Sequence, residues 1–122
     1  MNVVMSMVMV FLGGGFGSVL RFGLSNLSHL ICTEIWPATC LVNIIGSLTY
    51  VFLASKYPNM PPQYHQFLKA GVLGGLTTFS TFSYEIFSFI QKGQILTAVM
   101  IFSLNVLFGI AVGVWIFGHK LI

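Results

Sequence analysis

The sequence predicts an all-α membrane protein with four transmembrane helices, the third of which is broken near its middle. Of its 122 residues, 57% are hydrophobic, and only five are basic and two acidic. Ordinary soluble domains carry charge on about a quarter of their residues. Four apolar stretches also approach the length of about 20 residues that a helix needs to cross a bilayer.

The first two spans are expected over residues 3–21 and 38–55. The first stretch has no charged residue before Arg21, and the second has none before Lys56. Pro37 immediately precedes the second span, and prolines are common where a helix begins. Both stretches therefore indicate helices that meet lipid along most of their length.

The third and fourth spans are expected over residues 67–90 and 94–118, which completes a single four-span domain over residues 1–122. The third is unusual, since residues 74–83 hold two glycines and five hydroxyl side chains. A helix that only crosses lipid has no use for such a polar segment. Irregular backbone at membrane depth persists where protein or a water-filled cavity satisfies its polar groups, and broken helices often form ion sites. Residues 74–83 are therefore the expected functional centre.

The basic residues barely distinguish the two sides of the membrane. With four spans, Lys56, Lys69 and Lys120 share one side, while Arg21 and Lys92 lie on the other. Because excess Lys and Arg mark the cytoplasmic side, this split predicts insertion in both orientations. Two opposed copies can then pair, and an antiparallel dual-topology dimer is the expected assembly.

The charged residues also exclude several classes of function. The sequence has no Asp, and its only carboxylates are Glu34 and Glu85. No nucleophile, base and orienting group can be combined into an active site, so an enzyme is not expected. The basic residues do not cluster, which argues against a nucleic-acid partner.

Three motifs spread over the chain resemble those of one family, the CrcB or Fluc fluoride channels. The first is GGGFGSVLRF at residues 13–22, similar to the family's glycine-rich first helix that ends in Arg. The second is PATCLVNIIGS at residues 37–47, and the third is GVLGGLTTFSTFSYE at residues 71–85. The third motif, a TTFSTFS run followed by Glu in a broken span, is the most specific.

The resemblance implies a fluoride-selective channel that exports the ion passively across the cytoplasmic (inner) membrane and relieves fluoride toxicity. It implies an antiparallel homodimer with two pores and a structural sodium ion at the centre, held by the backbone carbonyls of Gly74 and Thr77. Arg21 is expected in an electropositive vestibule or, alternatively, as a cation that reaches the membrane interface. The resemblance places these residues along the fluoride pore: Asn43, Phe79, Ser80, Thr81, Phe82, Ser83 and Asn105.

The chemistry of fluoride agrees with these residue types. A pore must replace the tightly held water of this small ion with uncharged donors. Amide and hydroxyl groups donate hydrogen bonds, and the edges of aromatic rings are electropositive. Ordinary core packing for Phe79 and Phe82, and an interhelical hydrogen bond for Asn43, are the simpler interpretations. Gly109 and Gly113 stand where the family pattern leads one to expect further hydroxyls.

Two other functions fit four short helices. A dual-topology small multidrug exporter coupled to protons is the main alternative, but it requires a carboxylate within the membrane. Glu85 is near the end of its span and is expected to have a structural partner instead. A membrane subunit that only stabilises a complex is the second alternative, although a polar, broken third span serves no purpose in a scaffold.

Overall fold

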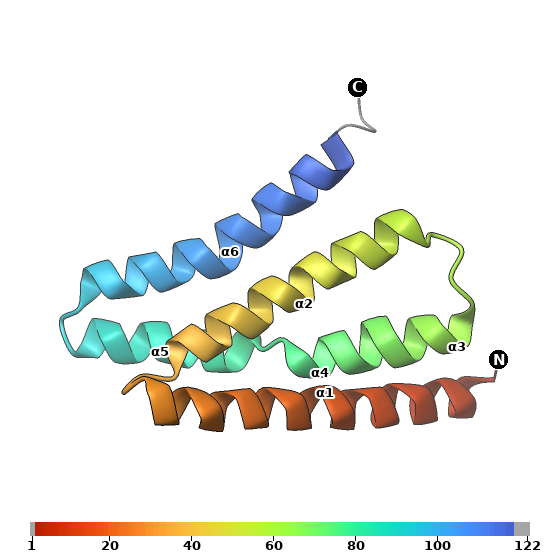
Figure 1. Ribbon diagram of the computed structural model, residues 1–122, viewed down its shortest axis with the longest axis horizontal. Coiled ribbons are helices and arrows are strands. Elements are labelled where there is room, and N and C mark those ends of the chain that lie inside the picture. Colours follow the sequence, from red (N-terminus) through yellow and green to blue (C-terminus); the bar gives the residue numbers. More distant parts are fainter. Residues whose placement is uncertain (1, 119–122) are drawn as a thin grey trace.

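All the regular secondary structure is helical over the residues that the computed structural model describes, residues 2–118 (Figure 1). Three of the helices, α1, α2 and α6, are long and apolar enough to cross a membrane. The elements in chain order are α1 (Val3–Ile31), α2 (Trp36–Lys56), α3 (Pro62–Tyr64), the π-helix η1 (His65–Leu73), α4 (Gly74–Leu76), α5 (Phe79–Gln91) and α6 (Ile95–Gly118).

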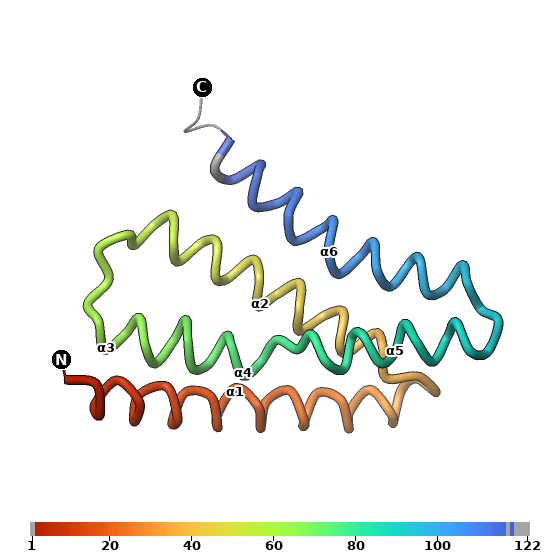
Figure 2. The backbone as a smooth tube through the Cα atoms, turned by 180° about the vertical axis from the view of Figure 1, so that it is seen from behind, coloured from red at the N-terminus to blue at the C-terminus, as the bar shows by residue number. Residues whose placement is uncertain are grey.

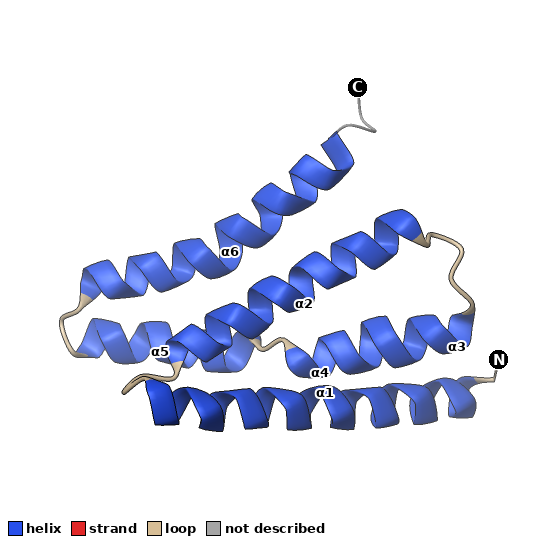
Figure 3. Cartoon of the chain, viewed as in Figure 1, coloured by secondary structure: helices blue, strands red, loops and turns tan. Residues whose placement is uncertain are grey.

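The third segment is divided, as the sequence predicts. Its first part runs without interruption through α3, η1 and α4, and its second part is α5. Figure 3 shows the short loop between them, which falls within the predicted residues 74–83. The π-helical turns of η1 were not predicted. Such wider turns occur mostly at functional sites.

Helix α1 lies alongside the first part of the broken segment, from α3 through η1 to α4 (Figures 1 and 2). Glycines make this approach close: a Cβ atom on Gly13 would overlap the Phe67 carbonyl, and one on Gly17 would overlap the Val72 carbonyl. From the facing segment, a Cβ atom on Gly75 would likewise overlap the Gly14 carbonyl. Small residues at helix interfaces in membranes allow such backbone contact.

Side chains form the other contacts of the fold. Helix α6 packs on α2 and on α5. The fully buried Ile101 and the buried Phe82, Phe89 and Ala98 form an apolar cluster between α5 and α6, and Trp36 packs against it. The α5–α6 turn uses Gly93 at φ 73°, a conformation that glycine adopts without steric strain.

The first helix is longer than the expected span of residues 3–21. It continues to Ile31. Between Arg21 and Ile31 the only Gly or Pro is Gly23, and a helix tolerates a single glycine. Arg21 consequently lies inside α1. Helix α6 ends at Gly118, as expected, and Lys120 lies outside the described residues.

Candidate functional site

The break itself consists of two threonines with extended backbone. Thr77 has φ −77° and ψ 152°, and Thr78 has φ −146° and ψ 122°. The Thr77 hydroxyl donates to the Leu73 carbonyl at 2.9 Å, which closes the end of α4. The Thr78 hydroxyl accepts from the Thr81 amide at 3.3 Å and caps α5. Threonine side chains thus replace the backbone bonds that the helix loses here.

Asn43 on α2 satisfies the remaining backbone groups of Thr78. Its Nδ2 donates to the Thr78 carbonyl at 3.1 Å, and its Oδ1 accepts from the Thr78 amide at 2.8 Å. The same Nδ2 donates to Oδ1 of Asn105 on α6 at 2.8 Å, and Asn105 in turn donates to the Ile101 carbonyl at 2.9 Å. A chain of amides therefore links α6, α2 and the break.

These amides and the two expected phenylalanines line one cavity of about 220 Å³. The rings of Phe79 and Phe82 are tilted by 55°, with centroids 5.7 Å apart. Phe82 is buried at 5% exposure and also stacks on Phe102, whereas Phe79 is 78% exposed. The other lining residues are Asn43, Ser47, Thr77, Thr78, Asn105 and Val106.

The hydroxyl residues of α5 do not all share this cavity. Ser80 lies 3.2 Å from the Thr78 hydroxyl, and Thr81 accepts a hydrogen bond from that same hydroxyl at 3.2 Å. Ser83 is half-buried and is not among the lining residues. The structure thus groups Ser80 and Thr81 at the start of α5, next to the cavity, and separates Ser83 from it.

Arg21 reaches the break from the side opposite Asn43. It is half-buried, and its Nε donates to the Gly75 carbonyl at 3.2 Å. The lost helical turn leaves this carbonyl without its usual partner. The structure therefore gives Arg21 a contact with the break, and its place in an electropositive vestibule or at the membrane interface stays a prediction.

The carbonyl oxygens of Gly74 and Thr77 are suited to binding a cation. Within the described chain, the amide of Thr78 is directed to Asn43 and that of Thr81 to the Thr78 hydroxyl, so neither amide occupies these carbonyls. No group of His, Cys, Asp or Glu that could hold a metal occurs among the described residues. Any ion at the break would thus depend on backbone, hydroxyl or amide oxygens.

Sequence reasoning missed Thr39, which pairs with Glu85. The Thr39 hydroxyl donates to Glu85 Oε1 at 2.7 Å, and both side chains are buried. This bond confirms the expected structural partner for Glu85, whose Oε2 is buried without a hydrogen bond from the described residues. The signal was the spacing: Thr39 precedes Asn43 by one helical turn, so both lie on one face of α2.

Comparison with known proteins agrees with the motifs. Residues 8–118 match a family described as CrcB-like protein, Camphor Resistance (CrcB). A relative from Coxiella burnetii, named Fluoride-specific ion channel FluC, is 38% identical over 92% of this chain and 94% of its own. Relatives of the same name from Methylobacterium and Shewanella pealeana are 38% and 35% identical, over 85% and 96% of this chain and 86% and 95% of their own. The chain belongs to the CrcB-like family.

Proposed function

We propose that this protein is a fluoride-selective channel of the cytoplasmic membrane, through which the ion leaves the cell passively. The observation that carries the proposal is the cavity at the break, where the amides of Asn43 and Asn105 meet the rings of Phe79 and Phe82. Relatives that are 35% to 38% identical bear the name Fluoride-specific ion channel FluC. The protein is a transport protein of the membrane and has no enzymatic role.

The cavity offers fluoride a set of weak, uncharged contacts. Ring edges are electropositive because of the aromatic quadrupole, and hydroxyls beside the cavity donate hydrogen bonds. The apolar walls exclude water. Because no charged residue lines this cavity, the ion is bound weakly enough to leave again. Phe79, Phe82, Asn43, Asn105 and the α5 hydroxyls Ser80 and Thr81 are the groups we assign to this path, while Ser83, which lies outside the cavity, stays a predicted pore residue.

A second, antiparallel copy of the chain completes the proposed channel, and all four segments cross the membrane. Phe79 lies mostly exposed in the single chain, and burial against the partner explains how its ring can face an ion rather than lipid. The carbonyls of Gly74 and Thr77 would hold a sodium ion at the dimer centre. When bound, this ion joins the two breaks electrostatically.

A proton-coupled drug exporter is the alternative that the geometry disfavours. Its carboxylate must exchange protons with water and substrate. Glu85 is buried, and its Oε1 is engaged by Thr39. The path at the break is instead built from amides, hydroxyls and rings.

Efflux from liposomes tests the function directly. With a potassium ionophore to balance the charge that leaves, purified protein should release fluoride in the absence of a pH gradient and pass chloride poorly. Release no faster than from empty liposomes, or release that requires a pH gradient, contradicts the channel.

Cysteine labelling in cells tests the dual topology. A single cysteine in the 57–61 loop should react from both faces of the membrane. Two or three lysines added near Met60 should bias that loop to the cytoplasm and reduce activity, because only opposed copies pair. One uniform orientation of the unmodified protein contradicts the antiparallel dimer.

A further inference from the structure

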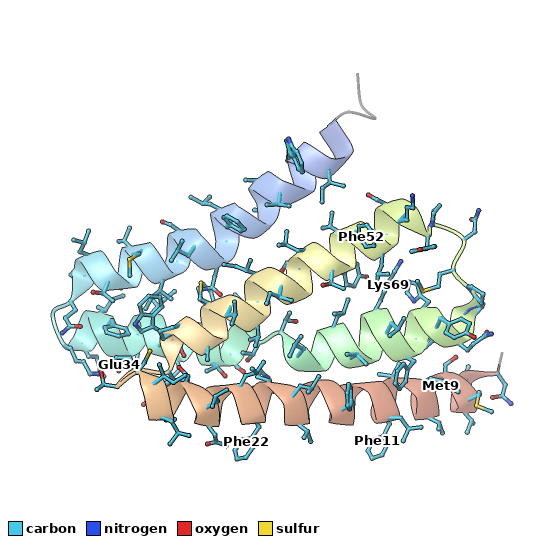
Figure 4. All side chains as sticks on the ribbon, in the orientation of Figure 1. Met9, Phe11, Phe22, Glu34, Phe52 and Lys69 are labelled. Carbon is cyan, nitrogen blue, oxygen red and sulfur yellow. The ribbon has the colours of Figure 1, made fainter. Side chains whose placement is uncertain are left out.

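Lys69 is a buried cation that neither the helix break nor the motifs explain. It lies in the π-helix η1, and its side chain is only 6% exposed. Figure 4 shows the side chain between η1 and α2. A lysine near a helix end normally extends its ammonium into water and buries only its stem. Lys69 does not.

The ammonium of Lys69 has no anionic partner among the described residues. Within residues 2–118, the ammonium lies over the face of the Tyr50 ring, at 5.9 Å from Nζ to the centroid. Glu34 lies at the opposite end of the molecule (Figure 4), and Glu85 is bonded to Thr39 on α2. A buried charge is costly unless it is paired, and a cation–π contact offsets only about 2 kcal/mol of that cost. An anion beside the ammonium would offset the rest of this cost.

A cavity beside Lys69 has room for a small anion. A cavity of about 330 Å³ is lined by Lys69, Tyr50, Ser47 and Thr77, with Gly46, Val51, Leu73 and Gly74. Ser47 and Thr77 also line the cavity that holds the two phenylalanines. The two cavities therefore share these two side chains in their linings, and Lys69 lines only the first of them.

We infer that Lys69 and Tyr50 form a binding site for a small monovalent anion in this cavity, which rests on the proposed function in that fluoride is the expected occupant. On the side that faces the break, Ser47 supplies a hydroxyl donor, whereas the Thr77 hydroxyl already donates to the Leu73 carbonyl. Lys69 supplies the attraction, and the uncharged donors beyond it receive the ion. Clefts of one sign with low-dielectric walls raise the local concentration and entry rate of the opposite ion.

The test compares Lys69→Met, Lys69→Arg and Lys56→Gln in liposomes. Lys69→Met keeps the apolar stem and removes the charge, and should lower fluoride flux at low ionic strength by about tenfold or more. The loss should shrink when an impermeant salt screens the field. Lys69→Arg keeps the charge and should keep most of the flux. Lys56→Gln removes an exposed charge at the end of α2 and should leave flux close to that of the unmodified protein.

Fluorine NMR of fluoride with the detergent-purified proteins gives a second readout that needs no transport. The unmodified protein and Lys69→Arg should broaden the fluoride resonance, and Lys69→Met should broaden it less. Equal broadening by Lys69→Met overturns the site, whatever happens to flux. If the unmodified protein broadens the resonance through Lys69 but fails to carry fluoride in liposomes, the anion site stands and the channel function fails.

Discussion

Upstream of the break, the segment from Pro62 to Leu76 contacts α1 through backbone atoms, with Gly13 and Gly17 leaving no space for side chains. Downstream, α5 contacts α2 and α6 through side chains, among them Phe82 and Glu85. The first half is thus held against α1 by its backbone, and the second half places the side chains of Phe79 and Phe82 at the cavity. Because the helix is broken between them, each half can be oriented independently, so one segment can both pack on α1 and line the cavity.

The largest effect should come from the backbone contact. Gly17→Ala puts a methyl group into the Val72 carbonyl, and α1 must move away. Overpacking of this kind costs about 3 kcal/mol or more when backbone has to shift, so we expect little folded protein by size-exclusion chromatography. Gly15→Ala is the matched control, because a Cβ atom there meets nothing within 4 Å. Equal yields of folded protein for the two variants would contradict the close backbone contact at Gly17.

The next largest effect concerns the phenylalanines. Phe79→Ile and Phe82→Ile remove the ring quadrupole, and a loss of about 3 kcal/mol at the barrier slows flux roughly a hundredfold. Only Phe82→Ile should also lower thermal stability, since Phe79 is 78% exposed in the single chain. Flux per dimer is the measurement.

Phe87→Ile on the same helix, 54% exposed, is the control for this comparison and should keep its flux. Phe79→Tyr and Phe82→Tyr should be milder than the Ile variants because the ring survives. Normal flux per dimer in both Ile variants would remove the rings from the mechanism.

A smaller effect is expected from Asn43→Ala, which sharpens the role of the break. It leaves the amide and carbonyl of Thr78 without partners, and at this part-buried position each unsatisfied group costs about 1 kcal/mol, the low end of the usual range. The melting temperature should fall measurably. Asn43→Asp retains the acceptor for the Thr78 amide and should recover part of the stability, but not the flux, because a carboxylate beside the rings repels anions. Stability unchanged in Asn43→Ala would contradict the bridging role.

The smallest effect should come from Thr39→Val, a change of nearly the same shape. It removes the bond to Glu85 Oε1 and should lower the free energy of unfolding by about 1–2 kcal/mol. Thr49→Val on the same helix serves for comparison, since the Thr49 hydroxyl bonds only to the Ile45 carbonyl of its own helix. A larger loss for Thr49→Val than for Thr39→Val would show that the buried pair does not stabilise α2 against α5.

Much of the fold was accessible from the sequence, because lipid imposes strong local rules. Uncharged runs identified α1, α2 and α6, and the dense hydroxyls of residues 74–83 located the break. Helix α1 continues to Ile31, beyond the expected span of residues 3–21, whose end was placed at the first charged residue, Arg21. A charge inside a helix is accommodated when a neighbour supplies a partner, and here the Gly75 carbonyl does so.

The helices, the position of the break and the residue types around it could be predicted from the sequence, since hydrophobicity and turn-forming residues act locally. The pairing of groups could not: the side chain of Asn43 bonds to Thr78, Thr39 pairs with Glu85, and Lys69 is buried beside Tyr50. The reason is physical. These contacts join residues on different helices, and the rotation and spacing of each helix pair depend on close backbone packing along the glycines of α1.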